Sequence, residues 1–156
     1  MDDIVIARAL HVLAVVHWIG GVAFVTLIVL PLARSRPAAE ALAQFTAFEE
    51  RFASQVRISI PLAGATGLWM TYRMNLWDRF ADPRFWWMSA MFGLWLVFML
   101  MVFVIEPLLH DRFEREARRA PLSTLRRVAG LHAALLTLAA ITVLGAVAGA
   151  QGLSFF

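Results

Sequence analysis

Residues 4–32 read IVIARALHVLAVVHWIGGVAFVTLIVLPL, and Arg8 is the single formally charged side chain among them. A run of this length exceeds the roughly 20 apolar residues that a helix needs to cross a bilayer. The run nevertheless contains His11 and His17. Because lipid offers no water to solvate an ionisable group, a histidine in such a segment predicts a functional site by default.

The composition favours a membrane protein for the whole chain. Hydrophobic residues make up 61% of its 156 residues, whereas soluble domains are nearer half apolar. Cysteine and lysine are both absent, which excludes disulfides, thiolate metal sites and Schiff-base chemistry on lysine. The net charge of +3 comes from arginines at the predicted membrane edges, so no nucleic-acid partner is expected. Redox chemistry in this chain therefore requires a bound cofactor or metal.

Four apolar stretches are each long enough to cross a bilayer as a helix: about 4–32, 56–75, 85–109 and 123–150. Between the first two, a polar and helix-favouring run predicts a cytoplasmic amphipathic helix at about 38–53. We therefore expect an all-α fold, with residues 1–156 forming a single transmembrane domain. Its predicted architecture is an integral membrane four-helix bundle.

The distribution of arginines predicts the orientation of this bundle. Ten lie in or beside the connections between spans one and two and between spans three and four: Arg34, Arg36, Arg51, Arg57, Arg112, Arg115, Arg118, Arg119, Arg126 and Arg127. The opposite side has four: Arg8, Arg73, Arg79 and Arg84. The positive-inside rule puts the larger group in the cytoplasm. The prediction is a multi-pass protein of the bacterial inner membrane with both termini on the periplasmic side.

Helical geometry separates the two histidines of the first span. They are six residues apart, which is about 240° around a helix, so they face different directions. His11 shares its face with Trp18, whereas His17 lies beside Gly20 and Gly21. These glycines leave a notch that admits either a flat macrocycle or a neighbouring helix. A hydrogen bond to another helix is the alternative role for each imidazole. The pattern favours His11 as a ligand and leaves His17 as the second candidate.

Methionines of the second and third spans are expected at a similar depth to His11. At about 1.5 Å per residue, His11 lies roughly 10 Å outside the midplane of its span. Met70 and Met74 on the second span, and Met88 and Met91 on the third, fall in the same outer layer. Imidazole and thioether together suit Cu(I), or a haem iron with one histidine and one methionine. The candidate metal ligands are His11, Met70 and Met91, although methionine also fills irregular gaps in cores.

His132 of the fourth span is a further candidate cofactor ligand, on the cytoplasmic half. Haem with two histidine ligands needs both imidazoles in nearly the same layer. His132 and His11 are predicted too far apart in membrane depth to bind one haem. His132 and His17 are closer in depth, but still not in the same layer.

Arg57 and Glu106 are both predicted at the cytoplasmic membrane edge. They either pair with each other, or Arg57 binds a haem propionate, because guanidinium binds carboxylates in a bidentate manner. For a haem in the outer layer, Arg8 or Arg73 would take that role instead.

Small residues on the fourth span suggest a close helix–helix contact. The pairs Gly145 with Gly149 and Ala148 with Gly152 have the small-xxx-small spacing that lets helix backbones approach. This contact lies either within the bundle or across a possible homodimer.

The residue pattern resembles a known family. The motif A-L-H-x6-W-x-G-G, formed by Ala9, Leu10, His11, Trp18, Gly20 and Gly21, resembles the first helix of copper-resistance D (CopD)-like membrane proteins and of the related HemJ-type protoporphyrinogen oxidases. Arg51-Phe52 and Thr66-Gly67-Leu68-Trp69 are similar to that family's second segment. The resemblance implies a four-helix membrane bundle and b-type haem binding at the histidine that matches His11. The chain departs from the HemJ pattern in having no lysine, where that family uses one in its third helix.

Three functions remain open from the sequence. The leading prediction is a small inner-membrane b-type haem protein, an electron-transfer or oxidoreductase component that works with a redox partner. Its haem would be bound by His11, with Trp18 packed nearby. The second is a copper-binding or copper-transport protein that uses His11 and the outer methionines. The third is a structural or assembly protein of the membrane, whose histidines only form hydrogen bonds between helices.

Overall fold

The computed structural model describes residues 1–153, without the side chains of Arg34, Ala38 and Ala39. Every secondary-structure element in this part of the chain is helical, which confirms the all-α prediction. The last three residues of the predicted domain lie outside the described residues. So does the side chain of Arg34, one of the ten arginines behind the predicted orientation.

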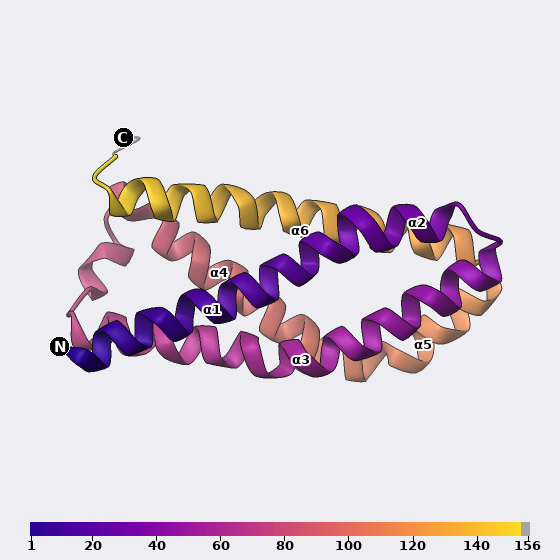
Figure 1. Cartoon of the computed structure of the whole chain (residues 1–156), viewed down its shortest axis with the longest axis horizontal. Helices are drawn as coiled ribbons and strands as arrows, with labels where there is room; N and C mark the ends of the chain where they lie inside the picture. Colours follow the sequence, from indigo (N-terminus) through magenta and orange to yellow (C-terminus); the bar gives the residue numbers. More distant parts are fainter. Residues whose placement is uncertain (154–156) are drawn as a thin grey trace.

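The described residues form four long helical segments that pack side by side (Figure 1). In chain order the elements are α1 (Asp2–Phe24), η1 (Val25–Val29) and α2 (Leu30–Arg34); α3 (Ala38–Arg73); η2 (Trp77–Phe80) and η3 (Pro83–Phe85); α4 (Trp86–Leu100), η4 (Met101–Ile105) and α5 (Glu106–Arg119); and α6 (Pro121–Ala150). The start of α1 and the end of α6 lie at the same end of the bundle (Figure 1). We call this the terminal end, and the opposite end, with residues 35–37 and Ala120, the loop end.

Two of the helical segments each contain one π-helical turn and continue as helix beyond it. The π-helical turns η1 and η4 each end two residues before a proline, Pro31 and Pro107, which occupy the first turns of α2 and α5. Proline donates no backbone N–H, and its ring clashes with the carbonyl four residues earlier. A wider turn relieves that clash. As a result α1 continues into α2, and α4 into α5, as two unbroken rods.

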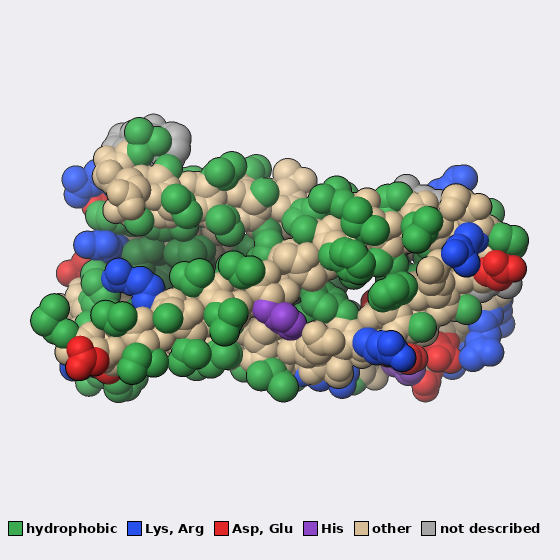
Figure 2. All heavy atoms as spheres, viewed as in Figure 1, with side chains coloured by type: hydrophobic (Ala, Val, Ile, Leu, Met, Phe, Trp, Pro, Cys, Tyr) green, Lys and Arg blue, Asp and Glu red, His purple; other side chains and the backbone are tan. Residues whose placement is uncertain are grey.

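Three of the helical segments are long and apolar enough to cross a membrane: Asp2–Ala33, Pro83–Arg119 and Pro121–Ala150. The predicted second span, 56–75, corresponds to the second half of α3, which ends at Arg73, and is not among them. The predicted amphipathic helix at 38–53 is the first half of the same helix. Charged side chains gather mainly toward the two ends of the molecule, with apolar ones between (Figure 2). The architecture is therefore a helical bundle suited to a membrane.

Side-chain contacts fix the antiparallel register of α1 and α3. Asp3 forms an ion pair with Arg73, with 2.7 Å between its Oδ2 and the guanidinium Nε. Farther along, His11 meets Ala63. His11 therefore lies opposite the middle of the stretch of α3 between Arg57 and Arg73. From the sequence, His11 is predicted in the outer layer, roughly 10 Å outside the midplane of its own span.

Two buried clusters stabilise the bundle. The central one joins all four segments and includes Trp18, Ile60, Phe98 and Leu135. A second cluster, nearer the loop end, forms around Phe45 and Leu30 and joins them to α6. The central cluster borders the cavity described below, so the core of the bundle positions that site.

The glycines of α6 make contacts within the chain. A side chain at Gly145 would meet the indole of Trp86, and one at Gly149 would meet that of Trp87. Both tryptophans lie at the start of α4. The small-xxx-small pair therefore lets α4 approach α6, which is the first of the two contacts predicted for it.

Glu49 of α3 is a partly buried carboxylate outside the apolar spans. Burial raises its pKa from 4.5 to about 7, with repulsion from Glu106 and Glu50 acting in the same direction and His110 opposing them. The folded chain therefore holds a proton here near neutral pH, whereas the unfolded chain does not.

This shift predicts a pH-dependent stability. A raised pKa in the folded state contributes stability that is complete below the unfolded value of 4.5 and is lost as pH rises through about 7. We expect the free energy of unfolding in detergent to fall by about 2–3 kcal/mol between about pH 5 and about pH 8. Glu49→Gln should remove this slope, and Glu40→Gln, at an exposed position of the same helix, should keep it. An unchanged slope in Glu49→Gln would refute the assignment.

Candidate functional site

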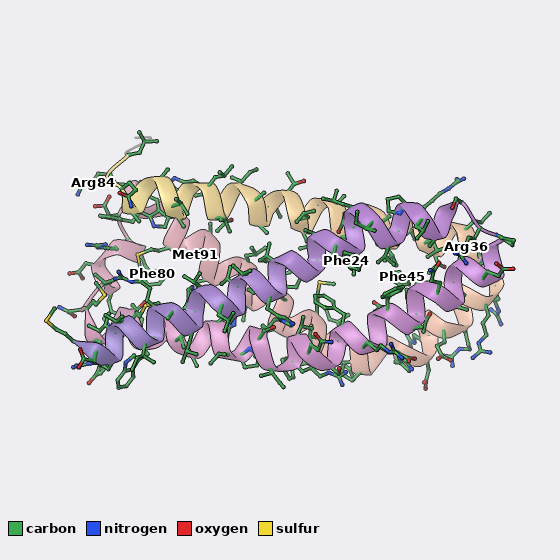
Figure 3. All side chains as sticks on the ribbon, in the orientation of Figure 1. Phe24, Arg36, Phe45, Phe80, Arg84 and Met91 are labelled. Atoms are coloured by element: carbon green, nitrogen blue, oxygen red, sulfur yellow. The ribbon has the colours of Figure 1, made fainter. Side chains whose placement is uncertain are left out.

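A cavity of about 320 Å³ lies between α1, α3, α4 and α6 in the terminal half of the bundle. The space-filling view shows it as a hollow between α1 and α6 (Figure 2). Met91 of α4 and Phe80 of η2, which both line it, lie in this region in Figure 3. The volume falls within the range of pockets that bind small molecules or cofactors.

One face of α1 forms a wall of this cavity. Arg8, His11, Val15 and Trp18 all line it. Their spacing of three, four and three residues places them on one face of an α-helix. The sequence had put His11 and Trp18 on one face, and the structure turns that face toward the cavity.

The imidazole of His11 is held by α3 through one of its two nitrogens. Its Nδ1 lies 2.8 Å from the carbonyl oxygen of Ala63 and 3.3 Å from Oγ1 of Thr66. Since a carbonyl can only accept, Nδ1 carries the proton and Nε2 keeps its lone pair in the neutral ring. No hydrogen bond to Nε2 is found among the described residues. Histidines that bind metals characteristically donate their other N–H in this way.

Glycine at position 67 makes room for this arrangement. A Cβ added at Gly67 would lie 3.2 Å from Cε1 of His11, which is closer than ordinary van der Waals contact. Gly67 lies one helical turn from Ala63, so α3 approaches the imidazole with bare backbone beside the carbonyl that fixes it. The ring is thereby both oriented and closely packed.

The four methionines of the predicted outer layer all line the cavity. Met70 comes from the last turn of α3 and Met74 follows the helix as its C-cap, while Met88 and Met91 come from the first turns of α4. The cavity therefore brings together His11 and both predicted methionine ligands, Met70 and Met91. Aromatic side chains complete its walls, among them Phe80, Phe92, Trp87 and Trp95.

Trp18 lines this cavity and carries a buried indole N–H group. Its side chain is 4% exposed and packs edge-on against Phe98, with 4.8 Å between ring centroids. Its indole N–H has no hydrogen-bond partner among the described residues. A buried donor without an acceptor is unfavourable, so an acceptor brought by a ligand would stabilise this wall.

His17 does not line the cavity. It is exposed on the other side of α1, where its Nε2 lies 3.1 Å from Oε1 of Gln55. The notch expected beside it is filled at Gly21 by the ring of Phe52, while Gly20 faces open space. At Gly21 the neighbouring helix α3 thus approaches α1 closely, which is the second of the two alternatives predicted for the notch.

The position of His17 predicts that its removal leaves the cavity intact. His17→Ala loses one exposed hydrogen bond, which should lower the free energy of unfolding by no more than about 1 kcal/mol. Ligand binding in the cavity should be unchanged in titrations followed by absorption. A loss of binding as large as that caused by replacing His11 would contradict this placement.

His132 and Arg57 also lie away from the cavity lining. The Nδ1 of His132 donates to the carbonyl of Val128, 3.0 Å away, and its ring packs edge-on against Phe45 of the second cluster. Arg57 pairs with Glu106 at 3.0 Å, which is the mutual pairing that the sequence allowed. Neither residue contributes to the site around His11.

Arg79 is a cavity residue that the sequence did not single out. It lies in η2 and lines the cavity together with Arg8. No motif marks it, because its place follows from the fold of the α3–α4 connection. Within the described part of the chain, the side chains that line the cavity include these two cations and no carboxylate. The site therefore suits a ligand with negative charge at one end.

The described residues contain no group of three or more histidine, aspartate or glutamate side chains that could hold a metal ion. A metal at this site would thus depend on His11 with methionines, or on a macrocycle that supplies further ligands. Comparison with known proteins adds no constraint: no family model, no curated protein and no solved structure matches this chain.

Proposed function

We propose that this chain is a small b-type haem protein of the bacterial inner membrane, with His11 as an axial ligand of the iron. The observation that carries the proposal is the hydrogen bonding of His11, which lines the cavity: Nδ1 donates to the carbonyl of Ala63, and Nε2 has no hydrogen-bond partner among the described residues. This is the arrangement in which a neutral imidazole binds a metal. The CopD-like and HemJ-like pattern around His11 points to the same residue.

The cavity walls support haem over a bare metal ion. Aromatic and aliphatic side chains line most of the cavity, which suits a flat apolar macrocycle. Met70 and Met91 are candidates for the second axial position, since haem iron is found with one histidine and one methionine. Bound haem supplies one-electron chemistry. The chain's own part is to orient His11, exclude water and hold the macrocycle.

Copper binding is the second candidate, and the four thioethers near His11 favour it. Soft sulfur ligands select Cu(I). Two features of the same cavity oppose it: Arg8 and Arg79 line the site, and no described lining residue supplies a carboxylate. A cation would be repelled by these arginines, whereas an anionic ligand would be attracted.

The proposed orientation in the membrane follows from the arginines. With the loop end in the cytoplasm, both termini and the arginines beside the cavity face the periplasm. The chain would then act as an electron-transfer or oxidoreductase component that exchanges electrons with a redox partner at the membrane.

An absorption spectrum with metal analysis tests the proposal. The purified chain, produced with haem available, should show a Soret band and sharp α and β bands on reduction, and it should contain iron. A colourless protein with stoichiometric copper would replace the first candidate by the second. A protein that takes up neither haem nor copper would refute both.

A further inference from the structure

The terminal end of the bundle carries four arginines, and they divide into two kinds. Arg73 and Arg84 have carboxylate partners, Asp3 and Asp82 respectively, each at 2.7 Å. Arg8 and Arg79 both line the cavity, and no ion pair to either is found among the described residues. The unpaired cations are thus the two that face the site.

Arg8 stands in a fixed relation to His11. It precedes His11 by three residues on the same face of α1, which places it about one turn, or roughly 4.5 Å, nearer the terminal end. Trp18 lies on the opposite side of His11 along that face. The cavity therefore has a cationic end at Arg8 and an apolar, aromatic end at Trp18.

Arg79 reaches the same end from a different element. Its guanidinium lies over the ring of Phe85, with 4.6 Å from Cζ to the ring centroid. This cation–π contact positions the side chain without neutralising it. Two positive charges, one from α1 and one from η2, thus line a single cavity whose described lining has no carboxylate.

We propose that Arg8 and Arg79 together bind the two carboxylates of a dicarboxylate tetrapyrrole, so that its propionates point to the terminal end of the bundle. This inference rests on the proposed haem function and deepens it. Guanidinium binds carboxylates through paired, charge-assisted hydrogen bonds. Arg73 and Arg57 are excluded as the binding groups, because each is already paired with a carboxylate.

The test compares haem with its dimethyl ester, in which both propionates are neutral. Wild-type protein in detergent should bind haem about 10- to 100-fold more tightly than the ester, as expected for charged hydrogen bonds. The double variant Arg8→Gln with Arg79→Gln should bind the two compounds almost equally. In the matched control Arg84→Gln, which alters an arginine at the same end but outside the cavity lining, the preference should persist.

A second readout separates binding of the propionates from a structural role. Removing two positive charges near the iron disfavours the reduced state, so the double variant should have a lower reduction potential than wild type. Arg84→Gln and Arg57→Gln should not lower it comparably.

The outcomes distinguish the two proposals. Equal binding of haem and its ester by wild type would overturn the proposal that Arg8 and Arg79 bind the propionates, and it would leave the haem function standing. The same result is expected if these arginines bind a lipid headgroup instead. A loss of the preference in Arg57→Gln would also overturn it, because the propionates would then point to the loop end. Failure of wild type to bind either compound would refute the proposed function itself.

Discussion

Replacing His11 by glycine should lower haem affinity by more than about 100-fold and remove the low-spin spectrum. Outer partners of metal-binding histidines alone are worth 10- to 100-fold in affinity, so loss of the ligand itself should have a larger effect. Added imidazole should restore the spectrum, because the missing side chain leaves a space beside the carbonyl of Ala63 that imidazole can occupy. Absorption spectra with and without imidazole measure both effects.

Val12→Gly is the matched control for this substitution. It places glycine next to His11 in the same helix, at an exposed position outside the cavity lining. Glycine in a helix interior lowers stability by about 1 kcal/mol whatever its neighbours. If both variants lost haem equally, or if imidazole restored nothing, His11 would not be the ligand.

Replacing Gly145 by leucine should destabilise the bundle by about 3 kcal/mol, near the upper end for overpacked cores. The indole of Trp86 occupies the space that a side chain there would need. A leucine would therefore separate α4 from α6. Unfolding in detergent, followed by tryptophan fluorescence, measures the loss.

Gly130→Leu supplies the comparison in the same helix. No other atom lies within 4 Å of a Cβ at that position, and leucine has a higher helix propensity than glycine. Its stability should equal or exceed that of wild type. If instead Gly145→Leu kept wild-type stability and changed only the oligomeric state, the contact would lie between chains.

The helical fold was largely predictable because its signal is local. Long apolar runs predict helices in lipid, and the four segments follow them closely, including the two that continue through Pro31 and Pro107. The second span was the exception. Its half of α3 contains Arg57, Pro61 and several polar residues, so its place beside α1 depends on partners such as Asp3 and His11 rather than on apolarity.

The candidate site was predictable only in part. Helical rise and rotation, which depend on residue spacing alone, predicted His11 and the four methionines in one layer, and all five residues line the same cavity. Of the two alternatives predicted for the notch beside His17, the structure shows the neighbouring helix at Gly21, where the ring of Phe52 lies; the sequence does not show which side chain that is. Arg79 was missed because the path of the α3–α4 connection decides what its side chain faces. The unused Nε2 of His11 likewise required the position of Ala63.

The central claim is that one histidine nitrogen, from His11, binds a haem iron in this cavity. Pulsed electron paramagnetic resonance on ferric protein labelled with 15N-histidine counts the histidine nitrogens coupled to the iron. The account predicts one directly coordinated histidine, because His17 and His132 lie away from the cavity lining. Two coordinated histidines, or none, would contradict it.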